Sequence, residues 1–261
     1  MTETLVVPQR FRGPAGSANG GWTCGALAAV LGSGQTAVSV RLSAPPPLDV
    51  PLSITRFSLG GSRFGARLHE VTAGGERLIA EATRADPEQD DDLRPVPALD
   101  PDPDVAFDLA VQAGERYGGR TDHPFPTCLV CGTGREPGDG LLLRPGPGDP
   151  PDGTVSAAWT PHPALDDGTG HVDLAMTWAA LDCPGGWSAD LRGRPMVLGT
   201  MTARVDQRPR IGEPCVVRGA LAGQGSARTV PTRTTLYGPD GEILAVAGQV
   251  WVVVDPALFN G

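Results

Sequence analysis

The stretch VDLAMTWAALDCPGGW, residues 172–187, decides how the rest of this sequence is interpreted. From Val172 to Leu181 the residues are apolar around almost the whole helical circumference, which is typical of a helix buried on every side. Asp182 is the exception, and a carboxylate in such surroundings is costly unless it is paired, hydrogen-bonded or used in chemistry. The stretch therefore predicts a central buried helix that ends in one carboxylate.

The strands expected after this helix repeat an order already present nearer the N-terminus. Glycines open a helix predicted over 20–32, and turn signals then divide the following residues into strands at 36–44, 50–59, 63–72 and 76–85. The matching strands of the second half are expected at 196–206, 213–223, 227–237 and 242–255. An offset of 163 positions superposes Arg41 on Arg204 and Pro46 on Pro209, which favours an internal duplication over chance matching.

This order predicts an α+β chain with two similar halves. We assign residues 1–86 to an N-terminal half, 87–127 to an acidic, Pro-rich linker and 128–261 to a C-terminal half. Within the linker, 105–117 is compatible with a short helix, and a short strand is expected at 141–144. The 261 residues are enough for two small cores.

Charge and composition exclude some classes of partner. The net charge is −9 and every basic residue is Arg, which argues against nucleic acid or an anionic membrane as the main partner. No apolar run has the length of a membrane span, and residues 1–10 do not resemble a signal peptide, so we expect a cytoplasmic protein. The five cysteines are then expected as reduced thiols.

Several local motifs of the second half resemble those of PaaI-like thioesterases, and the repeated helix-and-strand order resembles the fused, double form of the hotdog fold. The motifs are CLVCG (128–132), DGLLLR (139–144), DGTVSAAW (152–159) and GHVDLAMTWAALD (170–182). The resemblance implies a double hotdog with two long central helices, each wrapped by an antiparallel β-sheet. It also implies an acyl-CoA or acyl-carrier thioester as substrate, no cofactor, and homo-oligomers of double-hotdog units as an available assembly.

The departures from the family pattern predict where an active site would lie. In that pattern a His-Gly-Gly opens the helix and an acidic residue follows nine positions after the His. Here Asp182 takes the acidic position of the second half without the glycines, whereas Asn19-Gly20-Gly21 takes the glycine position of the first half and Ala28 replaces the acid. If the halves pack like two protomers, one composite site joins Gly20 and Gly21 to Asp182.

In this composite site the glycine amides would polarise the thioester carbonyl, and Asp182 would act as general base or as nucleophile. Asn19, Trp22, Trp178 and Thr200 are the candidate substrate-binding residues. The alternative is structural: Asp182 only caps or pairs at the turn into CPGGW, and the glycines only allow a tight helix entry.

Gln249 is a further catalytic candidate, because AVAGQVWV resembles the closing strand of TesB-like thioesterases, where a Gln helps to hold the water. The alternative is a polar residue on the open face of a strand. A hotdog hydratase is a weaker interpretation, since no Asp-x-Asn-Pro-x-His segment is present. A non-catalytic acyl-binding protein that has lost its catalytic set is the alternative function.

Cys128 and Cys131 form a CxxC pair. A zinc site would need two more ligands, for which His123 and Cys183 are the nearest offers, neither at the usual spacing. The sequence therefore favours packed thiols and no metal.

Overall fold

The structure is a computed structural model that describes residues 3–32, 36–60, 63–85, 93–148, 150–255 and 257. Strands in the first half are β1 (Glu3–Val6), β2 (Val38–Leu42), β3 (Pro51–Gly60), β4 (Arg63–Thr72) and β5 (Gly75–Arg84). Strands in the second half are β6 (Gly146–Pro147), β7 (Thr154–Trp159), β8 (Met196–Val205), β9 (Cys215–Leu221), β10 (Thr229–Tyr237) and β11 (Ile243–Val253). The α-helices are α1 (Gly20–Ala29), α2 (Pro103–Glu115) and α3 (Leu174–Ser188), with 3-10 turns at Gln9–Phe11, Gly118–Arg120 and Pro163–Leu165.

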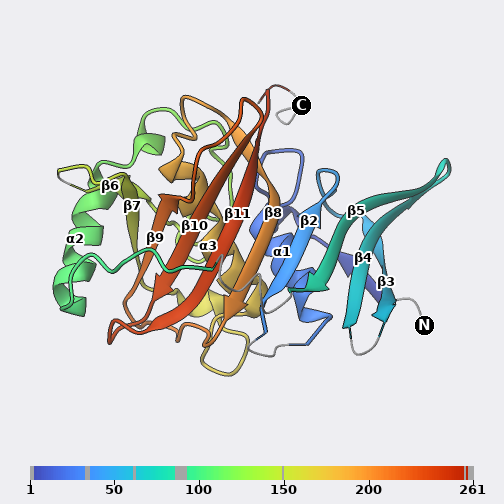
Figure 1. Ribbon diagram of the computed structural model, residues 1–261, viewed down its shortest axis with the longest axis horizontal. Coiled ribbons are helices and arrows are strands. Elements are labelled where there is room, and N and C mark those ends of the chain that lie inside the picture. The colour runs from blue at the N-terminus through green and yellow to red at the C-terminus, as the bar shows by residue number, and fades with distance from the viewer. Residues whose placement is uncertain are drawn as a thin grey trace.

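The strands form one continuous antiparallel sheet, with α1 and α3 packed side by side against the same face (Figure 1). The strand order is β1-β3-β4-β5-β2-β8-β11-β10-β9-β7-β6. The expectation of a separate sheet around each helix is therefore corrected, because β2 and β8 pair with each other and join the two halves. Pairing satisfies backbone groups that two separate sheets would leave unpaired at their edges.

The register at this seam is that of a twofold axis. Ser39 lies opposite Thr202, its equivalent 163 positions later, and the Thr202 hydroxyl donates to the Ser39 hydroxyl over 3.0 Å. On either side, Val38 pairs with Ala203 and Val40 pairs with Met201. The offset of 163 makes Met201 the equivalent of Val38 and Ala203 the equivalent of Val40, so each valine pairs with the equivalent of the other. In a twofold interface residue i meets j and j meets i. The two halves therefore face each other as two subunits of a homodimer would.

Helix α3 is buried along its whole length, as its apolar circumference predicts, and all residues from Ala175 to Trp187 are buried. It does not end at Asp182: the expected turn at CPGGW is instead the last part of the helix, despite Pro184 inside it. The carbonyl of Leu181 accepts hydrogen bonds from the side chains of Thr234 and Gln249, which tie this part of α3 to the sheet.

The expectation of two long central helices is also corrected, because α1 has 10 residues and α3 has 15. Two glycines of α1 allow these helices to cross closely. A Cβ on Gly21 would lie 2.5 Å from Cβ of Asp182, and one on Gly25 would lie 2.7 Å from Cα of Ala175. The crossing therefore brings the N-terminus of α1 directly against the middle of α3.

The described part of the segment between the halves, from Leu93 onward, packs against the sheet of the second half. Residues 86–92, which hold most of the acidic run, lie outside the described residues. Beyond them Leu93 and Val96 are buried, and Val96 accepts from the Tyr237 hydroxyl and donates to Thr235. Helix α2 confirms the short helix expected here and packs against β6, β7 and β9.

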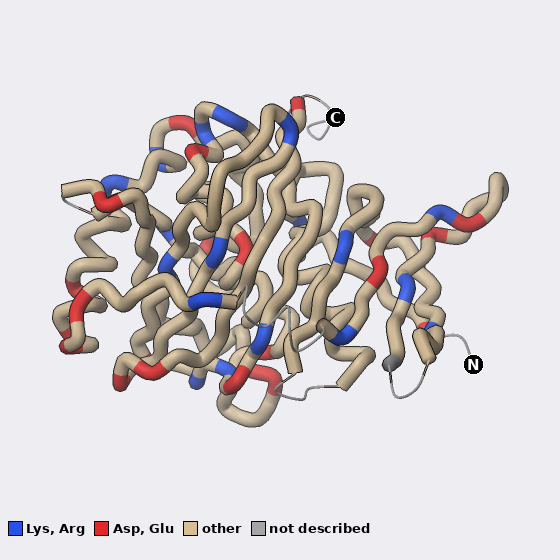
Figure 2. Tube along the Cα trace, in the orientation of Figure 1, with Lys and Arg blue, Asp and Glu red and all other residues tan. Residues whose placement is uncertain are grey.

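Residues 141–144 do not form the expected strand. The N–H groups of Leu141 and Leu143 instead donate to the carbonyls of Leu129 and Val130, so this segment supports the turn that carries Cys128. Arginines of the described residues occur in both halves, interspersed with acidic residues along the chain (Figure 2). Among the described residues, none of the helices has the length and hydropathy needed to cross a membrane.

Candidate functional site at the seam of the two halves

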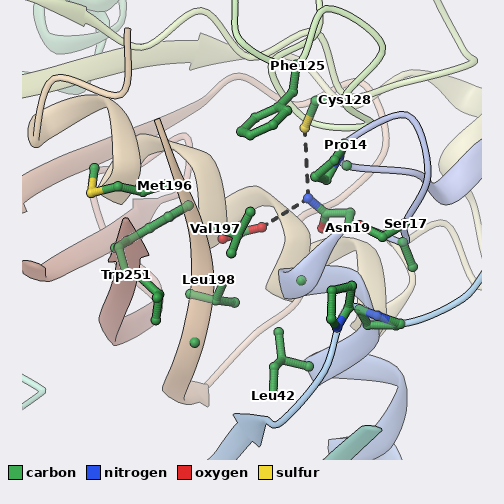
Figure 3. Close-up of a pocket in the computed structure, with 18 of the residues that line it drawn as sticks. Pro14, Ser17, Asn19, Leu42, Phe125, Cys128, Met196, Val197, Leu198 and Trp251 are labelled. Carbon is green, nitrogen blue, oxygen red and sulfur yellow. Dashed lines mark hydrogen bonds between the residues drawn. The ribbon is translucent and has the colours of Figure 1, made fainter. Parts of the chain in front are cut away.

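A cavity of about 320 Å³ opens between the two halves, where α1 begins and β2 ends. Its walls are mostly apolar and include Leu42, Pro45, Pro46, Phe125, Met196, Val197, Leu198, Trp251 and Val252. Its polar lining comes from Ser17, Ser43, Asn19, Asp182 and three cysteines, Cys128, Cys131 and Cys183. Figure 3 shows Asn19 between Cys128 and the strand that carries Val197 and Leu198. Both halves therefore contribute to one concave site.

Among the residues that the structure describes, Asp182 is the only carboxylate that lines this cavity, and it is 2% exposed. Its Oδ2 accepts a hydrogen bond from the Asn19 amide nitrogen and another from the Gly21 backbone N–H, both at 3.0 Å. Its Oδ1 is buried and has no partner among the described residues. The carboxylate is thus oriented by the other half of the chain, with one oxygen left for chemistry or for a ligand.

The pKa of Asp182 is raised to about 7, because burial disfavours the carboxylate and the charge of Cys128 adds to this effect. The hydrogen bonds from Gly21 and Asn19 act in the opposite direction and hold the pKa down. A carboxyl group with a pKa near neutrality can both accept and return a proton at physiological pH.

The predicted glycine amides have different roles. Asn19 caps α1 by accepting from the Trp22 N–H over 2.8 Å, so the first turn of the helix presents its remaining N–H groups near Asp182. The Gly21 N–H is engaged by Asp182 itself. The Gly20 N–H has no acceptor among the described residues, and Gly20 lines the cavity. Among the described residues, Gly20 therefore combines a place in the cavity lining with a backbone N–H that has no acceptor.

Three buried thiols line the same cavity as Asn19. The Asn19 amide is 3.9 Å from Cys128 Sγ, and Cys128 Sγ is 3.6 Å from Cys183 Sγ. Hydrogen bonds from the thiols of Cys131 and Cys183, and from the backbone N–H groups of Cys131 and Val130, hold the pKa of Cys128 well below its usual value. Of the two further ligands that the sequence offered to the CxxC pair, His123 and Cys183, the fold brings Cys183 into the same cluster of sulfur atoms.

Two of the predicted substrate-binding residues, Trp22 and Trp178, lie elsewhere. Trp22 stacks on Phe11 with ring centroids 4.5 Å apart and does not line the cavity. Trp178 lines a smaller hollow of about 200 Å³, together with Leu174 at the start of α3 and Ala28. This hollow occupies the position related to the main cavity by the repeat, and Ala28 stands where a carboxylate would be needed.

Gln249 and Thr200 are not in the Asp182 cavity either. The Gln249 side chain donates to the Leu181 carbonyl and to Thr234, each over 2.7 Å, and accepts from Thr232 over 2.9 Å. These bonds satisfy a buried amide between the sheet and α3. Thr200 and Gln249 both belong to the lining of another hollow of about 550 Å³ over β8, β10 and β11.

Sequence reasoning missed the apolar wall of the site. Phe125, Leu42 and Met196 give no signal beyond hydrophobicity, because they come from a loop, the end of β2 and the start of β8, which lie far apart in sequence. The close contact between α1 and α3 could have been predicted from Gly21 and Gly25, because two glycines four residues apart are typical of closely packed helices.

The fold, with the cavity between its two halves, is that of the hotdog class in its double form. The chain is similar over its whole length to solved structures of that class. A candidate oleoyl thioesterase from Lactobacillus plantarum is 12% identical with a TM-score of 0.56, covering 97% of this chain and 96% of its own. A hot dog protein from Alicyclobacillus acidocaldarius is 15% identical with a TM-score of 0.54, covering 97% and 93%.

The tesB protein of Mycobacterium avium subspecies paratuberculosis is also similar, at 12% identity and a TM-score of 0.54, covering 91% of this chain and 88% of its own. No protein-family model matches the sequence, and no curated protein matches it. At these identities the likeness confirms the double-hotdog fold that the sequence motifs predicted.

Proposed function

We propose that this protein hydrolyses acyl thioesters at one composite site formed by Asn19, Gly20 and Asp182. The observation that carries the proposal is the pairing of Asp182 Oδ2 with Asn19 and Gly21 of the other half, next to the unpaired Gly20 N–H. This arrangement joins a proton acceptor and a carbonyl-polarising amide in one apolar cavity. Full-length similarity to thioesterase structures supports the same reaction class.

In the proposed reaction the thioester carbonyl oxygen accepts from the Gly20 N–H at the positive end of α1. Asp182 Oδ1 takes a proton from a water molecule, and the resulting hydroxide adds to the carbonyl carbon. The tetrahedral intermediate then expels the thiolate, which receives the proton from Asp182. In the alternative route Asp182 attacks the thioester carbonyl carbon and expels the thiolate, which leaves a mixed anhydride. If water then attacks the Asp182 carbonyl carbon of the anhydride, oxygen-18 from labelled water enters Asp182 in a single turnover, which the general-base route does not allow.

The cavity favours a compact acyl group. Its volume of about 320 Å³ lies at the low end of the range for small-molecule sites, about 300–1,000 Å³. None of the described residues that line it is cationic, so we expect the phosphates of an acyl-CoA to bind outside it. We therefore expect short or aromatic acyl groups, presented by CoA or by an acyl carrier, to be preferred over long chains.

The test is steady-state hydrolysis of short, long and aromatic acyl-CoAs by wild type, Asp182→Asn and Asp173→Asn. Asp173 is the matched control, because it caps α3 outside the cavity and Asn is an equally good cap. We expect Asp182→Asn to lose roughly 100-fold or more in kcat/KM, as removal of a general base does, and Asp173→Asn to retain activity. Equal turnover in Asp182→Asn would refute the mechanism.

A non-catalytic acyl-binding protein is the second candidate. The engagement of Asp182 by Gly21 favours it, since a carboxylate that caps a helix start has a structural role without any reaction. Saturable binding of acyl-CoAs by wild type with no turnover of any of them would select this function.

A further inference from the structure

The proposed hydrolysis gives no role to the three thiols that line the same cavity. Cys128 and Cys131 come from the turn after residue 127, and Cys183 comes from α3. The three Sγ atoms lie within 4.8 Å of one another, and Cys128 and Cys183 are 3.6 Å apart. Thiolates that share a tetrahedral zinc ion at about 2.3 Å lie about 3.8 Å from each other. The spacing therefore matches one edge of such a site without rearrangement.

The turn that carries Cys128 and Cys131 is built to hold two sulfur atoms on one side. Gly132 donates its N–H to the Cys128 carbonyl, and a Cβ on Gly132 would lie 2.5 Å from that oxygen, so glycine is required here. The Asn19 side-chain amide donates to the Cys128 sulfur, with the two atoms 3.9 Å apart. A donor of this kind orients and supports a metal-bound ligand.

The surroundings of the cluster leave one direction open. All three cysteines are at most 5% exposed, and Leu129 and Tyr117 belong to the same buried core. No fourth His, Cys or carboxylate of the described chain lies close enough to all three sulfurs to complete the set. All three cysteines nevertheless line the cavity, so the remaining coordination position faces the space that a ligand would occupy.

We propose that Cys128, Cys131 and Cys183 bind one Zn²⁺ ion, whose fourth position is open to the cavity. Thiolates select zinc over hard cations such as Mg²⁺ or Ca²⁺. Zinc also fits the local charge better than a monovalent copper ion, because it leaves a single excess negative charge on three thiolates beside Asp182. The proposal rests on donor geometry and is independent of the proposed hydrolysis.

The test uses the full chain without a metal-binding tag, purified under a thiol-free reductant. Zinc content is measured by elemental analysis, and the metal-free protein is then titrated with Co²⁺. We expect one equivalent of bound ion, a thiolate-to-cobalt charge-transfer band whose intensity corresponds to three sulfur ligands, and displacement by Zn²⁺. This measurement needs no variant and remains decisive if the variants fold poorly.

Cys131→Ser tests the assignment, with Cys24→Ser and Cys215→Ser as matched controls, because these two cysteines are also buried but lie outside the cluster. We expect Cys131→Ser to weaken Zn²⁺ binding by roughly 100-fold, because each ligand contributes a share of the binding free energy of a structural zinc site. The two control variants should bind Zn²⁺ as wild type does. No stoichiometric Co²⁺ or Zn²⁺ binding by reduced protein would overturn the proposal. So would recovery of a Cys128–Cys183 disulfide in protein whose reduced form binds no metal.

Discussion

Adding one methyl group at the crossing of α1 and α3 tests the geometry on which the site depends. In Gly25→Ala the new Cβ would lie 2.7 Å from both Ala175 Cα and Trp178 Cβ. The optimum separation of carbon atoms is about 3.5–4.0 Å, so the helices would have to move apart by about 1 Å. In Gly21→Ala the Cβ would meet Asp182 Cβ at 2.5 Å and Ala179 Cα at 3.1 Å.

Overpacking of this kind costs about 1–3 kcal/mol, and the better helix propensity of Ala returns up to about 1 kcal/mol. Because the contacts at both glycines include backbone atoms that cannot rotate away, we expect a net loss of about 2 kcal/mol for either variant. For a chain of this size that corresponds to a Tm lower by about 4–8 °C. Thermal unfolding followed by circular dichroism measures it.

The two variants differ in their effect on Asp182. Gly21→Ala displaces the carboxylate directly, so its kcat/KM should fall well below that of Gly25→Ala at a temperature where both are folded. Gly74→Ala is the control, since a Cβ there would contact only Thr72 at 3.7 Å. An unchanged Tm in Gly21→Ala would refute the close crossing, and equal activity in Gly21→Ala and Gly25→Ala would refute the local effect on Asp182.

Three further results are expected. Gln249→Leu should lower the free energy of unfolding by about 1–3 kcal/mol, because the Leu181 carbonyl and Thr234 lose a hydrogen-bond partner between the sheet and α3. Its kcat should stay unchanged. A fall in kcat at an unchanged Tm would instead show that Gln249 is catalytic. Asn19→Ser should keep the helix cap but lose roughly tenfold in kcat/KM with the donor to Asp182, and full activity would contradict that role. The pKa of Asp182 in the folded protein is raised to about 7, and a general base acts only when it is deprotonated. In chelator-treated protein kcat/KM should therefore rise with pH up to about 7 and then level off. A profile that is flat below about pH 7 would count against Asp182 as the base.

The strands could be predicted well because their signals are local. Runs such as residues 63–72 and 196–206 alternate apolar and polar residues between turn signals, and β4 and β8 form there. Helix α3 was predicted to end too early, because Pro184 and two glycines usually stop a helix. The side chains of Thr234 and Gln249, distant in sequence, bind the Leu181 carbonyl, and no local pattern reports such contacts.

The candidate site was predictable only in part for the same reason. The family resemblance placed Asn19, Gly20 and Asp182 in one site on the assumption that the halves pack like protomers, and the structure brings these residues together. It could not indicate that Gly21 would already be bonded to Asp182, since this depends on how closely α1 crosses α3. The sequence motif predicts Trp178 as a substrate-binding residue of this site, yet Trp178 lines the smaller hollow together with Ala28.

The seam between Ser39 and Thr202 has a consequence for how this molecule can vary. In a dimer of identical subunits every substitution appears twice, so both sites must change together. Joining the halves in one chain removes that coupling while the sheet keeps its twofold register. The first half can then carry Asn19 and Gly20, and the second half can carry Asp182 with cysteines beside it, although the equivalent positions of the other half hold different residues. The stoichiometry follows directly: equilibrium dialysis should find one acyl ligand bound per chain, where a symmetric pair of the same size would bind two.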